Sequence, residues 1–215
     1  MTVLQKKNRS LSDRSSAIGC LAEIIGGMKN AVTPWTENLL ELFYRALADE
    51  EAEVQSNAAF ASGMLIEHSE LDLSQQYAAL LGSLRPIFAV SSDAPAARLN
   101  ARDNAAGAVA RLIVRNTSAI PLEHVLPVLV DALPLKNDPL ENRPVFRAIF
   151  HLFNTNAQAL IPYLDKLLAV FAYVLDPSQD EHIGQEMRGE LLNLIRTLNA
   201  QVPAQVQSAG LGAYL

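Results

Sequence analysis

Polar side chains recur at matched positions along this chain, and their types suit the binding of an extended peptide. The segment Arg102–Val114 has the pattern of an apolar helix with one polar exception, Asn104. Four other segments can be aligned with it, and the residues that take the place of Asn104 are Ser16, Asn57, Pro144 and Glu186. Asparagine amides can pair with peptide N–H and C=O groups, and nearby carboxylates can hold Lys or Arg head groups.

Motifs for catalysis, metal binding or phosphate binding are not found in the sequence. The four histidines are isolated and never spaced His-x-x-x-His: His68, His124, His151 and His182. Neither a Gly-x-x-x-x-Gly-Lys nor a Gly-x-Gly-x-x-Gly loop occurs. Glu186 and Glu190 are two carboxylates at i, i+4, but an open groove does not exclude water as acid–base catalysis requires. We therefore predict no enzyme, no metal site and no bound cofactor.

Composition and charge favour a helical protein with basic partners. Half of the 215 residues are hydrophobic, and 17 Lys plus Arg stand against 23 Asp plus Glu, which gives a net charge of -6. An acidic surface repels phosphate, so direct nucleic-acid binding is not expected. Cys20 is the single cysteine, which excludes an internal disulfide and suits a reducing compartment. The sequence shows neither a signal peptide nor an apolar run of the roughly 18 residues that a membrane helix needs.

The spacing of the five aligned positions indicates a repeat. Successive positions lie 41, 47, 40 and 42 residues apart. A period of about 40–47 residues is typical of two-helix HEAT or armadillo-type repeats. We predict an all-α superhelix of about five repeats, forming a single solenoid over residues 1–215. Because the first helix has no partner before it, we expect the chain to be a C-terminal fragment of something longer.

Helix signals divide the chain into pairs. Ser12 or Asp13 can cap a first helix that ends near Met28 at Gly26-Gly27, and Thr33-Pro34 suits the start of the next. A third helix is expected to end near Glu67-His68. The later expected helices are 74–90, 95–115, 121–133, 139–153, 157–175 and 181–199, with a short helix from Pro203.

The second helix of each pair is expected to line a concave face. Counting from the aligned position, registers −3, 0, +4 and +7 form one stripe of a helix with 3.6 residues per turn. On the first three second helices this stripe is Asp13, Ser16, Cys20 and Glu23; Val54, Asn57, Ala61 and Met64; and Ala101, Asn104, Ala108 and Arg111. On the last two it is Glu141, Pro144, Ala148 and His151; and Ile183, Glu186, Glu190 and Asn193.

Several segments resemble one known family. The runs DRSSAIGCLAEIIGGM, EVQSNAAFASGMLIE, RDNAAGAVARLI and LENRPVFRAIFHLF are similar to C-terminal HEAT repeats of importin-β-type (karyopherin) nuclear transport receptors, and within that family to the importin-4 branch. The resemblance implies a carrier, shuttling between cytoplasm and nucleus, for basic cargo such as core histone tails and ribosomal proteins. It also implies Ran-GTP and nucleoporins as partners of the full-length receptor, whose Ran-GTP-binding repeats lie at its N-terminal end.

The same resemblance implies that acidic and asparagine side chains hold a lysine-rich tail. The matching positions are Asp103 and Asn104 in RDNAAGA and Glu141 and Asn142 in LENRPVF, where Arg143 beside the acid weakens the attraction for lysine. Asp13, Asn57 and, from the stripe, Glu186 complete the predicted cargo-binding set.

Structural roles compete with this interpretation. Asn57 and Asn104 could satisfy backbone groups between repeats, Asp13 could cap a helix, and Glu141 could favour a helix N-terminus. Arg14 and Arg102 share a register and are expected to pair with acids in the turns. A non-transport HEAT scaffold is the main alternative function, and a HEAT-like DNA glycosylase is a second alternative that the negative charge disfavours.

Overall fold

The computed structural model describes residues 10–179 and 182–215, and every regular element in these ranges is helical. The chain has the predicted all-α, HEAT-like arrangement of helix pairs. It divides into two compact units, Met1–Ile120 (unit 1) and Pro121–Leu215 (unit 2), each with its own core. That the two units form a single solenoid stays a prediction.

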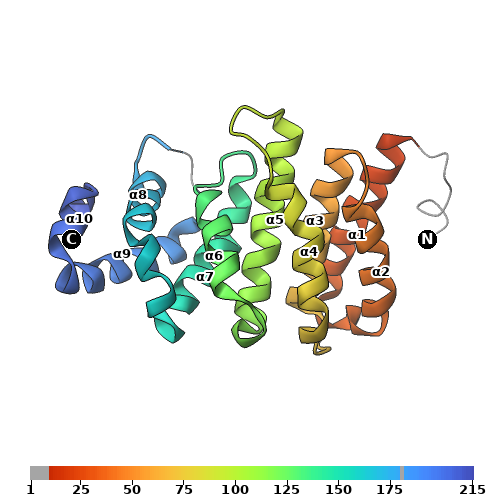
Figure 1. The fold of residues 1–215 in the computed structure, drawn as a ribbon, viewed down its shortest axis with the longest axis horizontal. Coiled ribbons are helices and arrows are strands. Elements are labelled where there is room, and N and C mark those ends of the chain that lie inside the picture. The colour runs from red at the N-terminus through yellow and green to blue at the C-terminus, as the bar shows by residue number, and fades with distance from the viewer. Residues whose placement is uncertain (1–9, 180–181) are drawn as a thin grey trace. The chain divides into compact units, whose positions relative to one another are not determined.

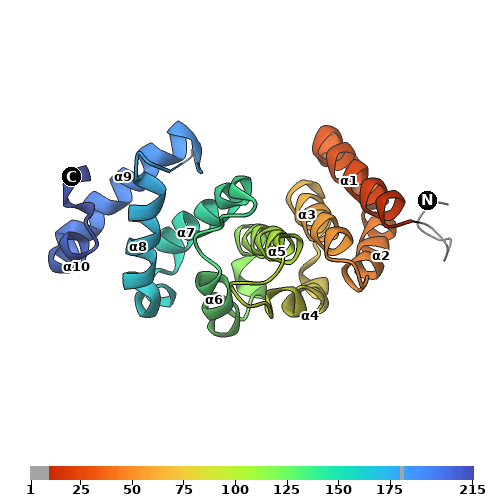
Figure 2. The same ribbon diagram turned by 90° about the horizontal axis from the view of Figure 1, so that it is seen from above.

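Unit 1 has two layers of helices (Figures 1 and 2). One layer contains the second helices of the repeats, which are α1 (Leu11–Met28), α3 (Ala52–His68) and α5 (Ala96–Arg115). The other contains α2 (Thr36–Leu47) and α4 (Tyr77–Phe88), which pack against α3 and α5. The 3₁₀ segments η1 (Lys29–Trp35), η2 (Ser74–Gln76) and η3 (Thr117–Ala119) lie in the connections.

Small residues allow α3 to lie very close to its two neighbours. A Cβ atom added at Gly63 would come within 3.1 Å of Ala108 Cα on α5, and one added at Gly26 of α1 would come within 3.0 Å of Met64 Cε. Ala58 and Ala61 of α3 and Ala105 of α5 are fully buried in the same layer. Close approach increases the number of van der Waals contacts per residue, and this compensates for the small side chains.

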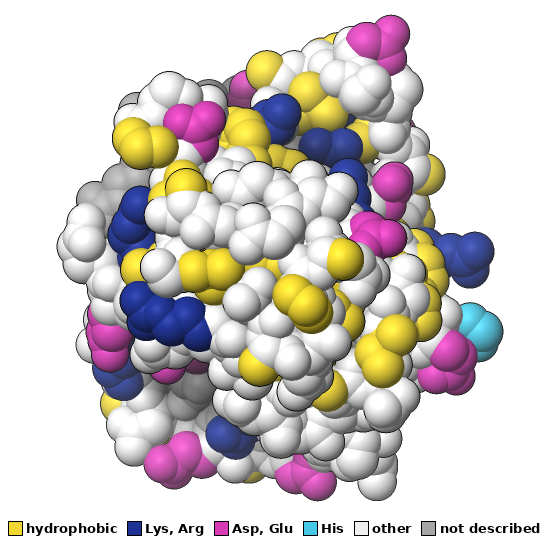
Figure 3. Space-filling view, turned by 90° about the vertical axis from the view of Figure 1, so that its left-hand side faces the viewer, with side chains coloured by type: hydrophobic (Ala, Val, Ile, Leu, Met, Phe, Trp, Pro, Cys, Tyr) yellow, Lys and Arg dark blue, Asp and Glu magenta, His cyan; other side chains and the backbone are white. Residues whose placement is uncertain are grey.

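Unit 2 continues the alternation of first and second helices. Its helices are α6 (Leu122–Asp131), α7 (Asn142–Thr155), α8 (Leu164–Leu175), α9 (Gly184–Gln201) and α10 (Pro203–Ser208), with 3₁₀ segments η4 (Pro139–Glu141), η5 (Ala157–Ala159), η6 (Ile161–Tyr163) and η7 (Leu211–Tyr214). Phe146 of α7 and Phe171 of α8 are fully buried with ring centroids 5.8 Å apart. Seen from the α10 end, hydrophobic side chains lie scattered among other uncharged side chains and backbone, with Lys, Arg, Asp and Glu side chains mostly toward the edges (Figure 3).

Several helix boundaries differ from the prediction. Ser10, and neither Ser12 nor Asp13, caps α1, because its hydroxyl accepts from Asp13 N at 3.1 Å. The predicted end of this helix near Met28 is confirmed; Gly26-Gly27 lie inside its last turn, and Lys29 then turns the chain with a φ of 53°. Thr33-Pro34 lie within η1, so α2 begins later, at Thr36.

Other boundaries agree with the sequence, or differ only in detail. Pro95 immediately precedes α5, and the short helix from Pro203 is confirmed. The helix expected over 157–175 is divided into two 3₁₀ turns and α8. The expected helix start at residue 181 lies outside the described residues, and α9 is described from Gly184.

The close approach of α3 and α5 gives a stability prediction. Replacing Gly63 by Val should lower the free energy of unfolding by about 1–3 kcal/mol, because the added Cβ would meet the Ala108 backbone of α5 as well as the Arg111 side chain, and the backbone cannot move aside. Gly82 on α4 is the control, since a Cβ there meets no atom within 4 Å. Gly82→Ala should raise stability by about 0.5–1 kcal/mol through helix propensity. Urea unfolding measures both, and equal effects would contradict the packing account.

Candidate functional site

Two of the predicted asparagines connect neighbouring second helices. Asn57 Nδ2 on α3 donates to the Ser15 backbone oxygen and to Ser15 Oγ on α1, both at 2.9 Å. Asn104 Nδ2 on α5 donates to Ser56 Oγ on α3 at 3.2 Å. Its second and third partners are the carbonyl and side-chain oxygens of Asn100, at 3.2 and 3.0 Å.

These two bonds follow one rule of the repeat. In each case the amide at the aligned position reaches a serine that directly precedes the aligned position of the previous repeat. Ser15 precedes Ser16, and Ser56 precedes Asn57. Asn104 is 5% exposed, so its amide fixes the register between α3 and α5. The structural alternative for these asparagines is therefore the one that the geometry favours.

Asn142 has a similar structural role inside unit 2. It is fully buried, and its amide accepts from Leu135 N at 3.2 Å and donates to the Leu135 oxygen at 2.8 Å. Its Nδ2 also donates to the Pro139 oxygen at 3.1 Å and lies 3.4 Å from His182 Nδ1. Asn142 thus holds the connection between α6 and α7 against the start of α7.

The predicted carboxylates divide into buried and exposed ones. Asp103 is 0% exposed, with Arg102 Nη2 at 3.7 Å from its Oδ1, and Glu141 in η4 is 3% exposed. Asp13 near the start of α1 and Glu186 in the first turn of α9 are both exposed. Only the exposed pair can contact a ligand without movement of the helices.

The accessible face of α3 differs from the stripe expected from the sequence. Val54 and Ala61 of that stripe are buried, because they pack against neighbouring helices. Asn57 and Met64 of that stripe remain half-exposed. The accessible face extends one step round the helix, where registers −4, +3, +7 and +10 are Glu53, Phe60, Met64 and Glu67. On α1 the residue at register +7 is Glu23, which is exposed. We call Glu23 and these four residues of α3 the acidic stripe.

Two arginines next to the acidic stripe are paired with acids. Arg14 of α1 donates from Nε and Nη2 to Asp49 at 3.0 and 3.1 Å, and this hydrogen bonding raises the pKa of Arg14. Arg111 of α5 donates from Nε to Glu67 Oε2 at 2.9 Å and lies 5.7 Å from the ring centre of Phe60. The predicted pairing of Arg14 with an acid in a turn is confirmed.

The excess of acid on this face follows from the sequences of its helices. Helix α3 contains no Lys or Arg, and α1 contains only Arg14. Glu23 and Glu53 therefore give the stripe a negative field that a cationic side chain would feel at short range. Sequence reasoning missed Glu53, Phe60 and Glu67; the signal that could have found them is the absence of Lys and Arg from α3.

The corresponding helix in unit 2 has the opposite charge. Helix α7 contains no Asp or Glu, and Arg143 and Arg147 are exposed on it. The predicted pair Glu141 and Asn142 is buried just before these arginines. The exposed part of α7 therefore does not favour lysine, as the presence of Arg143 suggested.

The described residues contain neither a cluster suited to a metal ion nor a membrane-spanning helix. Within 10–179 and 182–215, three or more His, Cys, Asp or Glu side chains are nowhere grouped so that they could hold a metal ion. Among the helices placed in those ranges, none is both long and apolar enough to cross a membrane.

Sequence comparisons give the relatives of this chain. Probable importin subunit beta-4 of Schizosaccharomyces pombe is 39% identical over 197 residues, which is 92% of this chain and 18% of that protein. Importin-4 of Homo sapiens is 30% identical over 204 residues, covering 95% of this chain and 18% of the human protein. The chain corresponds to a segment of an importin-4-type protein. No family model matches it.

The importin-4-type assignment confirms the resemblance seen in the sequence motifs. It also agrees with the helix-only, HEAT-like fold of both units. The chain spans about 18% of the length of these two relatives.

The asparagine bonds predict a loss of stability rather than of ligand contact. Asn104→Ala should lower the free energy of unfolding by about 1–2 kcal/mol, because Ser56 and Asn100 lose a buried partner. Asn154 is exposed on α7, so Asn154→Ala is the control and should change stability by less than about 0.5 kcal/mol. Should Asn104→Ala be as stable as the control, the amide has no bridging role in this importin-4-type chain.

Proposed function

We propose that this chain is a cargo-binding part of a nuclear import receptor and that the acidic stripe of unit 1 captures a basic, extended polypeptide. The observation that carries the proposal is the charge of α1 and α3. Their accessible face presents Glu23 and Glu53, while Arg14 and Arg111 are already matched by Asp49 and Glu67.

Capture begins with electrostatic attraction and ends with local packing. Glu23 and Glu53 attract Lys or Arg head groups, and the exposed parts of Phe60 and Met64 pack against the aliphatic stems of those side chains. The half-buried amide of Asn57 lies next to the stripe, and its oxygen can accept from a peptide N–H while Nδ2 holds Ser15. Arg111 keeps Phe60 and Glu67 in place through stacking and an ion pair.

The predicted site residues take two different parts in this proposal. Asp13 and Glu186 are exposed and stay predicted contacts. Asp103, Asn104, Glu141 and Asn142 are buried, so they act on cargo only through the helices that they position.

The names of the relatives support the wider proposal. The cargo we propose is basic protein such as core histone tails and ribosomal proteins, carried between cytoplasm and nucleus. Ran-GTP and nucleoporins are proposed partners of the full-length receptor, and neither nucleic acid, membrane nor a catalysed reaction is part of the proposal.

Charge-neutral variants test the stripe directly. In Glu23→Gln plus Glu53→Gln, the dissociation constant of a fluorescein-labelled lysine-rich peptide should rise about fivefold, as expected for two exposed ion pairs of about 0.5 kcal/mol each. The matched control is Glu123→Gln plus Asp131→Asn on α6, which makes the same change in net charge on exposed residues of unit 2. Fluorescence anisotropy at low and moderate salt measures both.

A lysine-acetylated version of the peptide gives an independent check. Acetylation removes the positive charge, so it should weaken binding to the parent chain and have little further effect on the stripe variant. Equal weakening by the stripe variant and the α6 control would contradict the proposal. Unchanged binding in the stripe variant would favour the alternative, a scaffold that docks partners through other surfaces.

A further inference from the structure

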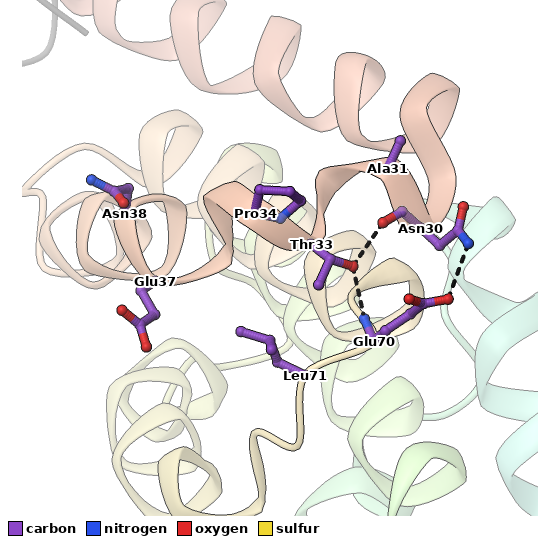
Figure 4. A pocket seen from close by; sticks show the side chains of 8 residues that line it. All are labelled: Asn30, Ala31, Thr33, Pro34, Glu37, Asn38, Glu70 and Leu71. Atoms are coloured by element: carbon purple, nitrogen blue, oxygen red, sulfur yellow. Dashed lines mark hydrogen bonds between the residues drawn. The ribbon is translucent and has the colours of Figure 1, made fainter.

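A cavity on a different part of unit 1 combines apolar walls with two carboxylates. It has a volume of about 550 Å³ and lies where η1 and the first turn of α2 meet the loop after α3. Pro34 and Leu71 form apolar walls, and Glu37 and Glu70 supply carboxylates (Figure 4). All four residues are exposed, so the cavity is open to a side chain that projects from another molecule.

Hydrogen bonds fix the shape of this cavity in advance. Glu70 N donates to Thr33 Oγ1 at 3.1 Å, and Asn30 Nδ2 donates to Glu70 Oε1 at 3.0 Å. Beneath them, the buried hydroxyls of Thr36 and Ser69 are 2.7 Å apart. The loop that carries Glu70 and Leu71 is thus tied to η1 and to the start of α2, which lowers the entropic cost of binding.

Hydrogen bonds from α5 and within the loop also hold the loop after α3 in place. Arg115 Nη2, at the end of α5, donates to the Ser69 carbonyl at 2.9 Å, and the Ser69 hydroxyl accepts from Leu71 N at 3.2 Å. Ser69 is 1% exposed, so these bonds are shielded from water. Leu71 nevertheless remains 39% exposed, which leaves an apolar surface beside the two carboxylates.

The lining fits one kind of side chain. An aliphatic stem can pack on Leu71 and Pro34 while its cationic head reaches Glu37, and Glu70, whose carboxylate is turned toward Asn30 on the other side of Leu71, adds negative charge to the rim (Figure 4). A carboxylate has about four lone-pair sites, so Glu70 can hold Asn30 and still accept from a ligand. Arg45, the cation of α2, is already paired with Glu41. Lys29 is exposed at the start of η1, so it is the cation that would weaken the local field.

We propose that this cavity seats a lysine or arginine side chain from an exposed segment of a partner protein. The site is separate from the acidic stripe, since Glu37 and Glu70 lie on η1–α2 and the α3 loop and not on the accessible face of α3. The proposal does not rest on the import function, because any basic segment with this side chain would fit.

Trp35 gives a local reporter of occupancy. It is the single tryptophan of the chain, it directly follows Pro34 of the cavity wall, and it is 50% exposed. The probe is the capped peptide Gly-Ser-Lys-Leu-Lys-Ser-Gly, which contains no aromatic residue, and the comparison peptide has Gln in place of both Lys. Titration into the complete chain should change the Trp35 emission in a saturable way for the lysine peptide and not for the glutamine peptide.

Three variants test whether the change in Trp35 emission comes from binding in the cavity. Glu37→Gln plus Glu70→Gln preserves side-chain volume and should weaken the Trp35-detected binding about fivefold, as for two exposed charge pairs. Glu123→Gln plus Asp131→Asn and the stripe variant Glu23→Gln plus Glu53→Gln should leave it within about twofold.

The outcomes separate this proposal from the proposed function. Equal binding of the lysine and glutamine peptides, or an unchanged Glu37/Glu70 variant, overturns the cavity assignment whatever the stripe does. Loss of the Trp35 signal in the stripe variant alone would also overturn it, because the reporter would then follow the stripe. A far-ultraviolet circular dichroism spectrum like that of the parent chain confirms that each variant is folded.

Discussion

The contact between neighbouring second helices is the constraint on which unit 1 depends. Helices α1, α3 and α5 approach closely because glycine and alanine occupy the contact, and Gly63 lies against the backbone of α5. Polar groups drawn into such a contact must be hydrogen-bonded, since an unsatisfied buried amide costs about 1–3 kcal/mol. Asn57 and Asn104 meet this requirement through the serines of the preceding helix.

The close contact between second helices determines which polar residues have a structural role and which remain accessible. An amide committed to a neighbouring helix holds the register of the repeat, and the charged residues one step further round the helix remain in water. Surface ion pairs such as Arg111–Glu67 add little stability, about 0–1 kcal/mol. Their larger effect is on the electrostatic potential of the acidic stripe. Asp49 and Glu67 neutralise Arg14 and Arg111, so the charges of Glu23 and Glu53 make this potential negative.

The repeat and most of the helices could be predicted from the sequence, but the accessible face of α3 could be predicted only in part. Spacing of about 40–47 residues and prolines such as Pro95 and Pro203 mark supersecondary units and helix starts, which are local properties of the chain. The cap at Ser10 was missed because Ser12 and Asp13 offer equally good local signals. Which signal prevails depends on packing with the next helix.

The difference between the expected stripe and the exposed side of α3 has a geometric cause. At 100° per residue, the predicted stripe of α3 is rotated by roughly 70° from the accessible one. Both faces contain small or polar residues, so periodicity alone does not distinguish the side that packs on α1 from the side that faces solvent. Asn104 and Glu141 were predicted contacts from the resemblance of their motifs to importin-β-type repeats, and their burial is visible only when neighbouring helices are in place.

The most direct test of the account is methyl NMR of the chain with labelled methionines during titration with a lysine-rich peptide. Met64 lies in the acidic stripe, whereas Met187 lies on α9 in unit 2 and is buried. The account predicts a saturable shift of the Met64 methyl signal, reversed by salt, with the Met187 signal unchanged. A shift of Met187 without one of Met64 would contradict it.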